Sequence, residues 1–141
     1  MARPAFQKLR IYRLAEDLSD AVWDLVLPWA IFAKDTTGKQ LVRSADSIGA
    51  NIAEGVGRGA CPDQQRFVRI ARGSLNETIH FLRRAYRRKL ITKQQVNQIK
   101  PLIDNLGPQL NSYLQSISSQ SRSARGKRAS NNGQHRSIAL S

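Results

Sequence analysis

Hydrophobic residues recur every three or four positions in four separate stretches of the chain, which is the spacing of one face of an α-helix. The first stretch runs through residues 11–29. Its regular helix should end close to Leu27, because the next residue is a proline, which lacks an amide donor and disfavours helical backbone before it. Beyond that proline, we expect Trp29, Ile31 and Phe32 to cover the end of the core.

A second apolar stripe covers residues 41–52 and predicts a helix that runs to about Glu54. The segment 35–38 before it has the composition of a capping turn. A group of alternating glycines follows this helix: Gly55, Gly57 and Gly59. Such glycines suit a left-handed helix end and an irregular turn. The next helix should begin near Pro62, because proline fits the first helical turn.

A third stripe extends over residues 67–85 without a proline, so we expect the longest uninterrupted helix there. The fourth helix should begin at Thr92, because Thr92 and Gln95 have the spacing of a capping box. Its apolar seam continues at spacings of three and four to residue 117. Pro108 opposes a regular helix, and we expect it to kink or divide this last one.

The connections between these segments are short, which favours an antiparallel up-down arrangement. A chain of 141 residues has the size of one domain, and 40% hydrophobic residues are enough for one core. We therefore predict an all-α protein with a four-helix bundle at residues 1–118. Residues 119–141 combine cations with polar residues and have no apolar stripe, so we expect a disordered basic C-terminal tail.

The net charge of the chain indicates which kind of partner it binds. The chain has 23 Lys and Arg residues against 10 Asp and Glu, a net charge of +13, which favours nucleic acid before an anionic membrane. In the third segment, seven arginines lie on the side away from the apolar stripe, with Glu77 as the main acid among them. Guanidinium groups match phosphate oxygens, so we expect this face and the tail cations to bind a polyanion. The expected contacts are Arg66, Arg69, Arg72, Arg83, Arg84, Arg87, Arg88, Arg122, Arg125, Lys127 and Arg128.

Structured RNA or a duplex is the favoured ligand, because the aromatic residues lie on core faces and do not form a stacking platform for single strands. Two other interpretations stay open. The arginines could be a solvated face, or the acidic stripe of the first helix could meet the basic third helix of another copy. Polar residues of the second and third helices also suit hydrogen-bonded pairs between helices. The expected interface residues are Asp17, Asp20, Asp24, Arg43, Asn51, Glu54, Arg58 and Glu77.

Enzymatic chemistry is not expected. His80 and His135, the two histidines, do not fit a catalytic triad, and the glycines after the second helix lack the lysine and hydroxyl of a P-loop. Cys61 has no CxxC motif or Cys/His cluster around it, so we expect neither a metal nor a cofactor. The longest apolar stretch is too short to span a membrane, and the N-terminus does not read as a secretory signal, which favours the cytoplasm.

Two strings of residues carry a family resemblance. One is RSADSIGANIAEG at residues 43–55, continued by Gly57-Arg58, and the other comprises Arg66-Phe67, IARGSL at residues 70–75, and Glu77. They resemble the four-helix-bundle proteins encoded within intervening sequences of bacterial 23S ribosomal RNA genes. The resemblance covers about residues 6–117, and Cys61-Pro62 and the prolines of the last helix depart from the pattern.

The same fold family includes the accessory variability determinant of diversity-generating retroelements, a basic pentameric bundle that partners a reverse transcriptase and its template RNA. The resemblance therefore implies a homopentamer without catalytic residues. Our hypothesis is a non-enzymatic, oligomeric bundle that binds RNA or an RNA/DNA hybrid as an accessory to a reverse transcriptase. The alternative is an interaction scaffold of the intervening-sequence branch, whose basic surface docks an acidic protein.

Overall fold

A computed structural model describes the backbone of residues 4–139, and side chains as far as residue 127 apart from those of residues 121 and 124. Within this range every regular element is helical. The elements are a 3-10 helix η1 (Ala5–Lys8), α1 (Arg10–Val26), a short α2 (Ile31–Ala33), a π-helical η2 (Lys34–Gly38), α3 (Lys39–Val56), α4 (Cys61–Arg87) and α5 (Lys93–Ala139).

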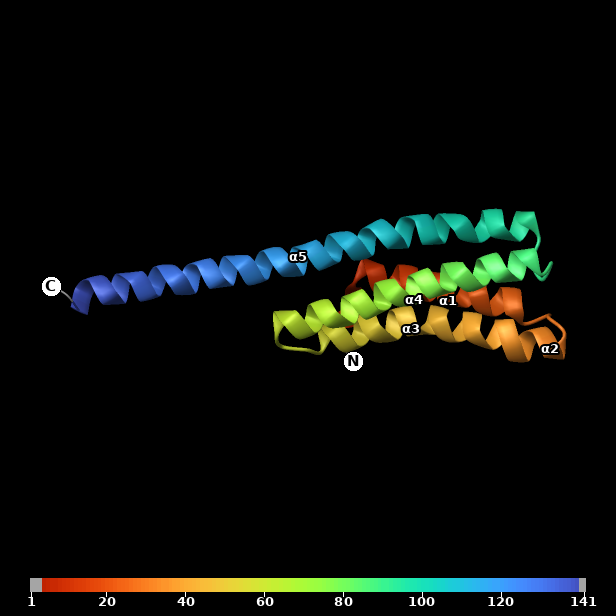
Figure 1. Ribbon diagram of the computed structural model, residues 1–141, viewed down its shortest axis with the longest axis horizontal. Helices are drawn as coiled ribbons and strands as arrows, with labels where there is room; N and C mark the ends of the chain where they lie inside the picture. The colour runs from red at the N-terminus through yellow and green to blue at the C-terminus, as the bar shows by residue number, and fades with distance from the viewer. Residues whose placement is uncertain (1–3, 140–141) are drawn as a thin grey trace.

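The four long helices form an antiparallel up-down bundle (Figure 1). Each packs against its two neighbours in the order α1, α3, α4, α5 and back to α1, with the most extensive contact between α3 and α4. In the bundle, α1 and α4 are therefore diagonal to each other, as are α3 and α5. This arrangement confirms the all-α bundle that the hydrophobic pattern predicts.

The connection from α1 to α3 differs from the expected turn. α1 ends at Val26, as Pro28 predicts, but the backbone is already helical from Ile31 onward and passes through η2 directly into α3. Trp29 is buried, whereas Ile31 and Phe32 are 78% and 81% exposed, so only the tryptophan covers the core. Ile31 and Phe32 lie on the outer side of the new helix that begins at Ile31. They therefore do not cover the core, as we expected them to.

Gly38 explains why η2 can lie so close to α1. A Cβ atom at this position would stand 2.7 Å from Val26 Cγ1 and 3.2 Å from the Ala33 carbonyl oxygen. Glycine is therefore required by a close approach of two helices and not by a turn. Similarly, a Cβ at Gly55 would lie 3.1 Å from Phe67 Cβ, where α3 meets α4. The described glycines all have negative φ, so the left-handed helix end expected at Gly55, Gly57 and Gly59 is wrong.

The left-handed residue is instead Lys89, with φ of 60°, in the hairpin between α4 and α5. The Leu90 amide donates to the Ala85 carbonyl at 2.9 Å and the Lys89 amide to the Tyr86 carbonyl at 3.0 Å. These two hydrogen bonds are those of a Schellman motif, in which glycine is the usual left-handed residue. A lysine occupies this position at an energetic cost.

The start of α5 agrees with the capping box that the sequence predicts. The Gln95 amide donates to Thr92 Oγ1 at 3.1 Å, and the Thr92 amide donates to Gln95 Oε1 at 2.9 Å. Pro101 and Pro108 lie inside α5 without dividing it, which makes α5 longer than α4. Both prolines are exposed, and so are Asn97 and Asp104, the residues whose carbonyls lose an amide partner because proline has no N–H.

The last helix is longer than expected. We expected it to end near Ser118, but α5 continues to Ala139, past the end of the bundle (Figure 1). No proline interrupts residues 119–139, so the backbone can extend the helix. Ile117 is the last buried residue of the core, and the described side chains after Ser118 are exposed. The segment thus lies outside the bundle, as predicted.

Candidate nucleic-acid interface

Six arginines of α4 and Arg88, which follows its last residue, are all exposed, which confirms the side of the helix on which the sequence places them. The opposite side packs through Val68, Ala71, Leu75, Leu82 and Ala85, together with the buried hydroxyls of Ser74 and Thr78. An amphipathic helix with this core face must project its arginines outward. They form two groups along α4, one at its N-terminal part and one at its C-terminal part: Arg66, Arg69 and Arg72, then Arg83, Arg84, Arg87 and Arg88.

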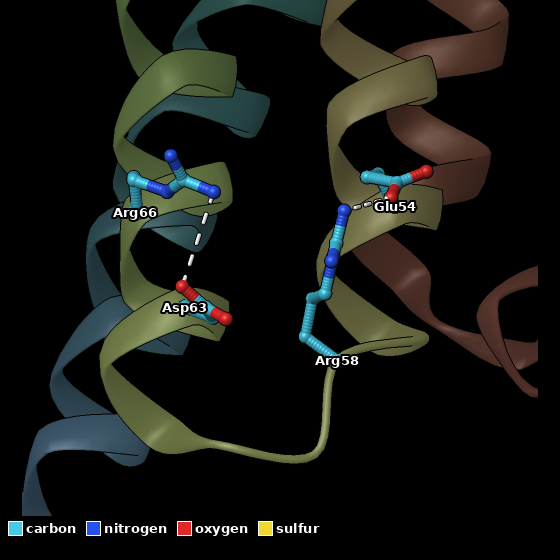
Figure 2. A network of polar contacts seen from close by, with 4 residues as sticks. All are labelled: Glu54, Arg58, Asp63 and Arg66. Carbon is cyan, nitrogen blue, oxygen red and sulfur yellow. Dashed lines mark hydrogen bonds and ion pairs between the residues drawn. The ribbon is translucent and has the colours of Figure 1, made fainter.

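Two arginines of the N-terminal group have partners within the chain. Arg66 Nη2 lies 3.9 Å from Asp63 Oδ1 (Figure 2), and the Arg66 guanidinium stands 4.9 Å from the centre of the Phe67 ring. Arg72 Nη1 donates to Asn111 Oδ1 on α5 at 3.3 Å. Both contacts are exposed and weak, but they direct these guanidinium groups toward neighbouring side chains.

In the C-terminal group, Arg88 is held by a neutral partner. Its Nη1 donates to the hydroxyl of Thr37 in η2 at 2.7 Å, and Thr37 is 4% exposed. Among the described residues, no carboxylate lies within ion-pair distance of Arg83, Arg84, Arg87 or Arg88. This group therefore keeps its full positive charge available to an external anion.

The tail cations are only partly described. Arg122, Arg125 and Lys127 are exposed on the part of α5 that extends beyond the bundle. The side chain of Arg128, which we also predict to bind nucleic acid, lies outside the described residues.

The predicted interface residues do not form one cluster. Asp17, Asp20 and Asp24 are exposed along α1, and because α1 and α4 are diagonal, this acidic stripe and the arginines of α4 cover opposite sides of the bundle. Glu77 is exposed on α4 between its two arginine groups, and Arg43 is exposed on α3. Among the described residues, no ion pair joins the acidic and the basic faces.

The remaining interface candidates bind within α3 and the loop that follows it. Arg58 Nη2 lies 2.7 Å from Glu54 Oε1, four residues earlier in the chain (Figure 2). The Arg58 guanidinium stands 5.0 Å from the centre of the Phe67 ring. Asn51 Nδ2 donates to the carbonyl and the hydroxyl of Ser47 at 2.8 and 2.9 Å. Glu54 pairs locally with Arg58, and Asn51 bonds within its own helix, so neither contact is the pair between helices that we expect from the sequence.

Sequence reasoning missed an apolar groove of about 440 Å³ between α1 and α3. Its lining includes Trp23 and Leu27, each 55% exposed, with Lys34, Lys39 and Arg43 contributing positive charge. The exposed Ile31 and Phe32 lie on the connection at the same end of the bundle. Trp23 falls off the core stripe of α1 by its helical spacing, which is the signal that could have identified it.

Two tyrosines have raised pKa values. Burial raises the pKa of Tyr113, and burial followed by the charge of Glu16 raises the pKa of Tyr12. The described residues contain no group of His, Cys, Asp and Glu side chains that could hold a metal ion. None of the helices in the described range is long and apolar enough to cross a membrane.

These features define the class: an antiparallel four-helix bundle whose outer face on α4 is strongly basic. The model of the 23S rRNA-intervening sequence protein family matches residues 7–112, and the chain belongs to this family. A crystal structure from Bacteroides thetaiotaomicron VPI-5482, of a protein with unknown function from the S23 ribosomal protein family, is similar, with a TM-score of 0.66 and 25% identity. The similarity covers 74% of this chain and 97% of that one. The curated proteins contain no match.

Proposed function

We propose that the protein is a non-enzymatic, nucleic-acid-binding bundle that holds the phosphate backbone of RNA, or of an RNA/DNA hybrid, on the arginines of α4. The observation that carries the proposal is the exposure of all seven arginines, of which only Arg66 lies within ion-pair distance of a described carboxylate. An exposed face that served solubility alone would mix both signs of charge. Free guanidinium groups are suited to bidentate phosphate binding.

The finer form of this proposal is an accessory role beside a reverse transcriptase in a diversity-generating retroelement. It is supported by the net charge of +13, by the cationic extension of α5 and by the resemblance of the sequence to the wider fold family. Acidic α1 and basic α4 on opposite sides also suit contacts between copies in a homo-oligomer, such as the pentamer that the resemblance implies.

The test is binding of a structured RNA and of a duplex DNA across a salt series, with the intact chain and with Arg69, Arg83 and Arg87 all changed to alanine. We expect the logarithm of the affinity for duplex DNA to fall with the logarithm of salt concentration by about 0.9 per phosphate contacted. If the whole α4 face contacts phosphates, the triple variant should lose roughly three such contacts and therefore about 2.7 units of slope, and a smaller loss would confine binding to part of α4. Equal slopes for the two proteins would contradict a role of α4.

A second candidate function is a protein-interaction scaffold, which the groove between α1 and α3 favours. It combines an apolar floor at Trp23 and Leu27 with cations at Lys34, Lys39 and Arg43, features that suit an amphipathic segment with acidic flanks. The same salt series separates the two functions, because a scaffold requires no affinity of the isolated chain for nucleic acid.

A further inference from the structure

Exposed cations without an ion-pair partner among the described residues gather where α4 meets α5, although others, such as Arg10 and Arg69, lie toward the opposite end of the bundle. The side chains of Arg84 and Arg87 are exposed near the C-terminus of α4 and form no hydrogen bond or ion pair with any described residue. At the other end of α4, Arg66 lies near Asp63 and Phe67, and Arg72 is bonded to Asn111. The two ends of the same helix therefore differ in how freely their arginines can take an external ligand.

Three other elements bring cations to the end where α4 meets α5. The up-down topology places the C-terminus of α4 beside η2, the start of α3 and the start of α5 (Figure 1). These elements and the hairpin between α4 and α5 carry four lysines. They are Lys34 in η2, Lys39 in α3, Lys89 in the hairpin and Lys93 in α5. Lys39, Lys89 and Lys93 are exposed, and Lys34 is half-buried.

Acids do not neutralise this end. Asp24 and Asp35 lie at the same end of the bundle, but among the described residues neither forms an ion pair with a lysine or arginine. We call the cationic surface made by Lys34, Lys39, Arg84, Arg87, Arg88, Lys89 and Lys93 the hairpin end.

Two local features suggest that this surface is arranged for a ligand. The buried hydroxyl of Thr37 accepts a hydrogen bond from Arg88 at 2.7 Å, which orients the guanidinium without cancelling its charge. Lys89 has φ of 60° at a position where glycine fits with less strain. Strained backbone of this kind clusters at binding sites, where the side chain is needed for function.

We propose that the hairpin end, and not the whole length of α4, is the phosphate-binding site, and that its cations bind neighbouring phosphates of one nucleic-acid backbone. This inference rests on the proposed function and specifies where the ligand binds. From Arg69 to Arg84 the helical rise amounts to roughly 22 Å, so cations at the two ends of α4 cannot share neighbouring phosphates. At the hairpin end, four elements direct cations to one region.

The experiment compares three variants that each lose three charges. One has Arg84, Arg87 and Arg88 changed to glutamine, a second has Lys34, Lys39 and Lys93 changed to glutamine, and a matched control has Arg66, Arg69 and Arg72 changed to glutamine. Binding to a short DNA duplex and to its RNA counterpart is measured across a salt series. Circular dichroism and the thermal midpoint establish that each variant is folded.

We expect both hairpin-end variants to lose about two to three units of the log–log salt slope on duplex DNA, and the control to lose less than about one. Equal losses in the control and the α4 hairpin variant would assign binding to the whole α4 face and overturn the inference, while leaving the proposed function intact. No loss in the lysine variant would also overturn it. Failure of the intact chain to bind either duplex would instead refute the proposed function.

Lys89 provides a second readout within the same site. Changing Lys89→Gly should raise the thermal midpoint by roughly 4 °C, because glycine relieves the left-handed strain, and should weaken binding by removing a cation. Lys89→Gln should weaken binding equally without raising the midpoint. If the glycine variant is more stable but binds duplex as tightly as the intact chain, Lys89 is not part of the site and the strain has no relation to it.

Discussion

Gly38 and Gly73 are both helical, yet their surroundings are opposite. A Cβ at Gly38 would overlap Val26 Cγ1 at 2.7 Å, and a Cβ at Gly73 would meet no atom within 4 Å. Val26 cannot easily move, because a β-branched side chain on a helix has one strongly preferred rotamer. The same substitution should therefore change stability in opposite directions at these two positions.

We predict that Gly38→Ala lowers the free energy of unfolding by about 1–2 kcal/mol, because overpacking outweighs the gain in helix propensity. Gly73→Ala should raise it by about 0.5–1 kcal/mol, because only the entropy of the unfolded chain changes. Urea denaturation of both variants measures the two effects. A stabilised Gly38→Ala variant would show that η2 does not lie against α1 as closely as described.

The sequence predicts some residue roles and misses others. Pro28 and the Thr92–Gln95 capping box act through their own backbone neighbours, and both are confirmed. The left-handed helix end was expected at glycines and occurs at Lys89, because a Schellman motif is decided by where the next helix must turn. When tertiary packing imposes a left-handed backbone on a residue such as Lys89, the local sequence does not reveal it.

The interface of α3 and α4 is the most extensive in the bundle, and hydroxyl groups run along it. Thr78 is fully buried, and its hydroxyl shares a hydrogen bond of 3.0 Å with Ser44 of α3. Farther along the same interface, the hydroxyls of Ser74 and Ser47 are also hydrogen-bonded at 3.0 Å. These pairs favour the observed register of the two helices, in addition to the bonds of 2.8 and 3.0 Å that the Thr78 and Ser44 hydroxyls donate to the Ser74 and Leu41 carbonyls of their own helices.

We predict that Thr78→Val lowers the free energy of unfolding by about 1 kcal/mol, because valine keeps the volume and removes the hydrogen bond. In combination with Ser44→Ala, the loss should be smaller than the sum of the two single losses, since the two hydroxyls act on each other. A double-mutant cycle in urea measures this coupling. Strictly additive losses would show that the two hydroxyls contribute independently to stability.

Helix positions were largely predictable, whereas their connections were not. The starts of α4 and α5 and the end of α1 follow from prolines, a capping box and a period of three to four residues. The π-helical passage from Ile31 into α3 was not foreseen, because residues 35–38 have a composition that also suits a turn. The backbone becomes helical there because the buried Thr37 and Gly38 pack against α4 and α1.

For the molecule as a whole, the core and the extension of α5 should be energetically separate. Ile117 is the last buried core residue, and the described side chains after Ser118 face solvent. Removing residues 121–141 should therefore change the free energy of unfolding by less than about 0.5 kcal/mol, while lowering the salt slope of duplex binding through the loss of cations. Denaturation and binding of the shortened chain measure both quantities, and a clear loss of stability would contradict the separation.

The sequence alone determined the helices, their inner faces and the exposure of the seven arginines, because periodicity and charge are local properties of the chain. Only the tertiary structure decided which helices are neighbours, and with this the diagonal placement of acidic α1 and basic α4. It also joined Arg88 to Thr37 across 51 positions of sequence and brought lysines of three elements to the hairpin end. Such contacts depend on how the apolar faces pack together, which no single segment specifies.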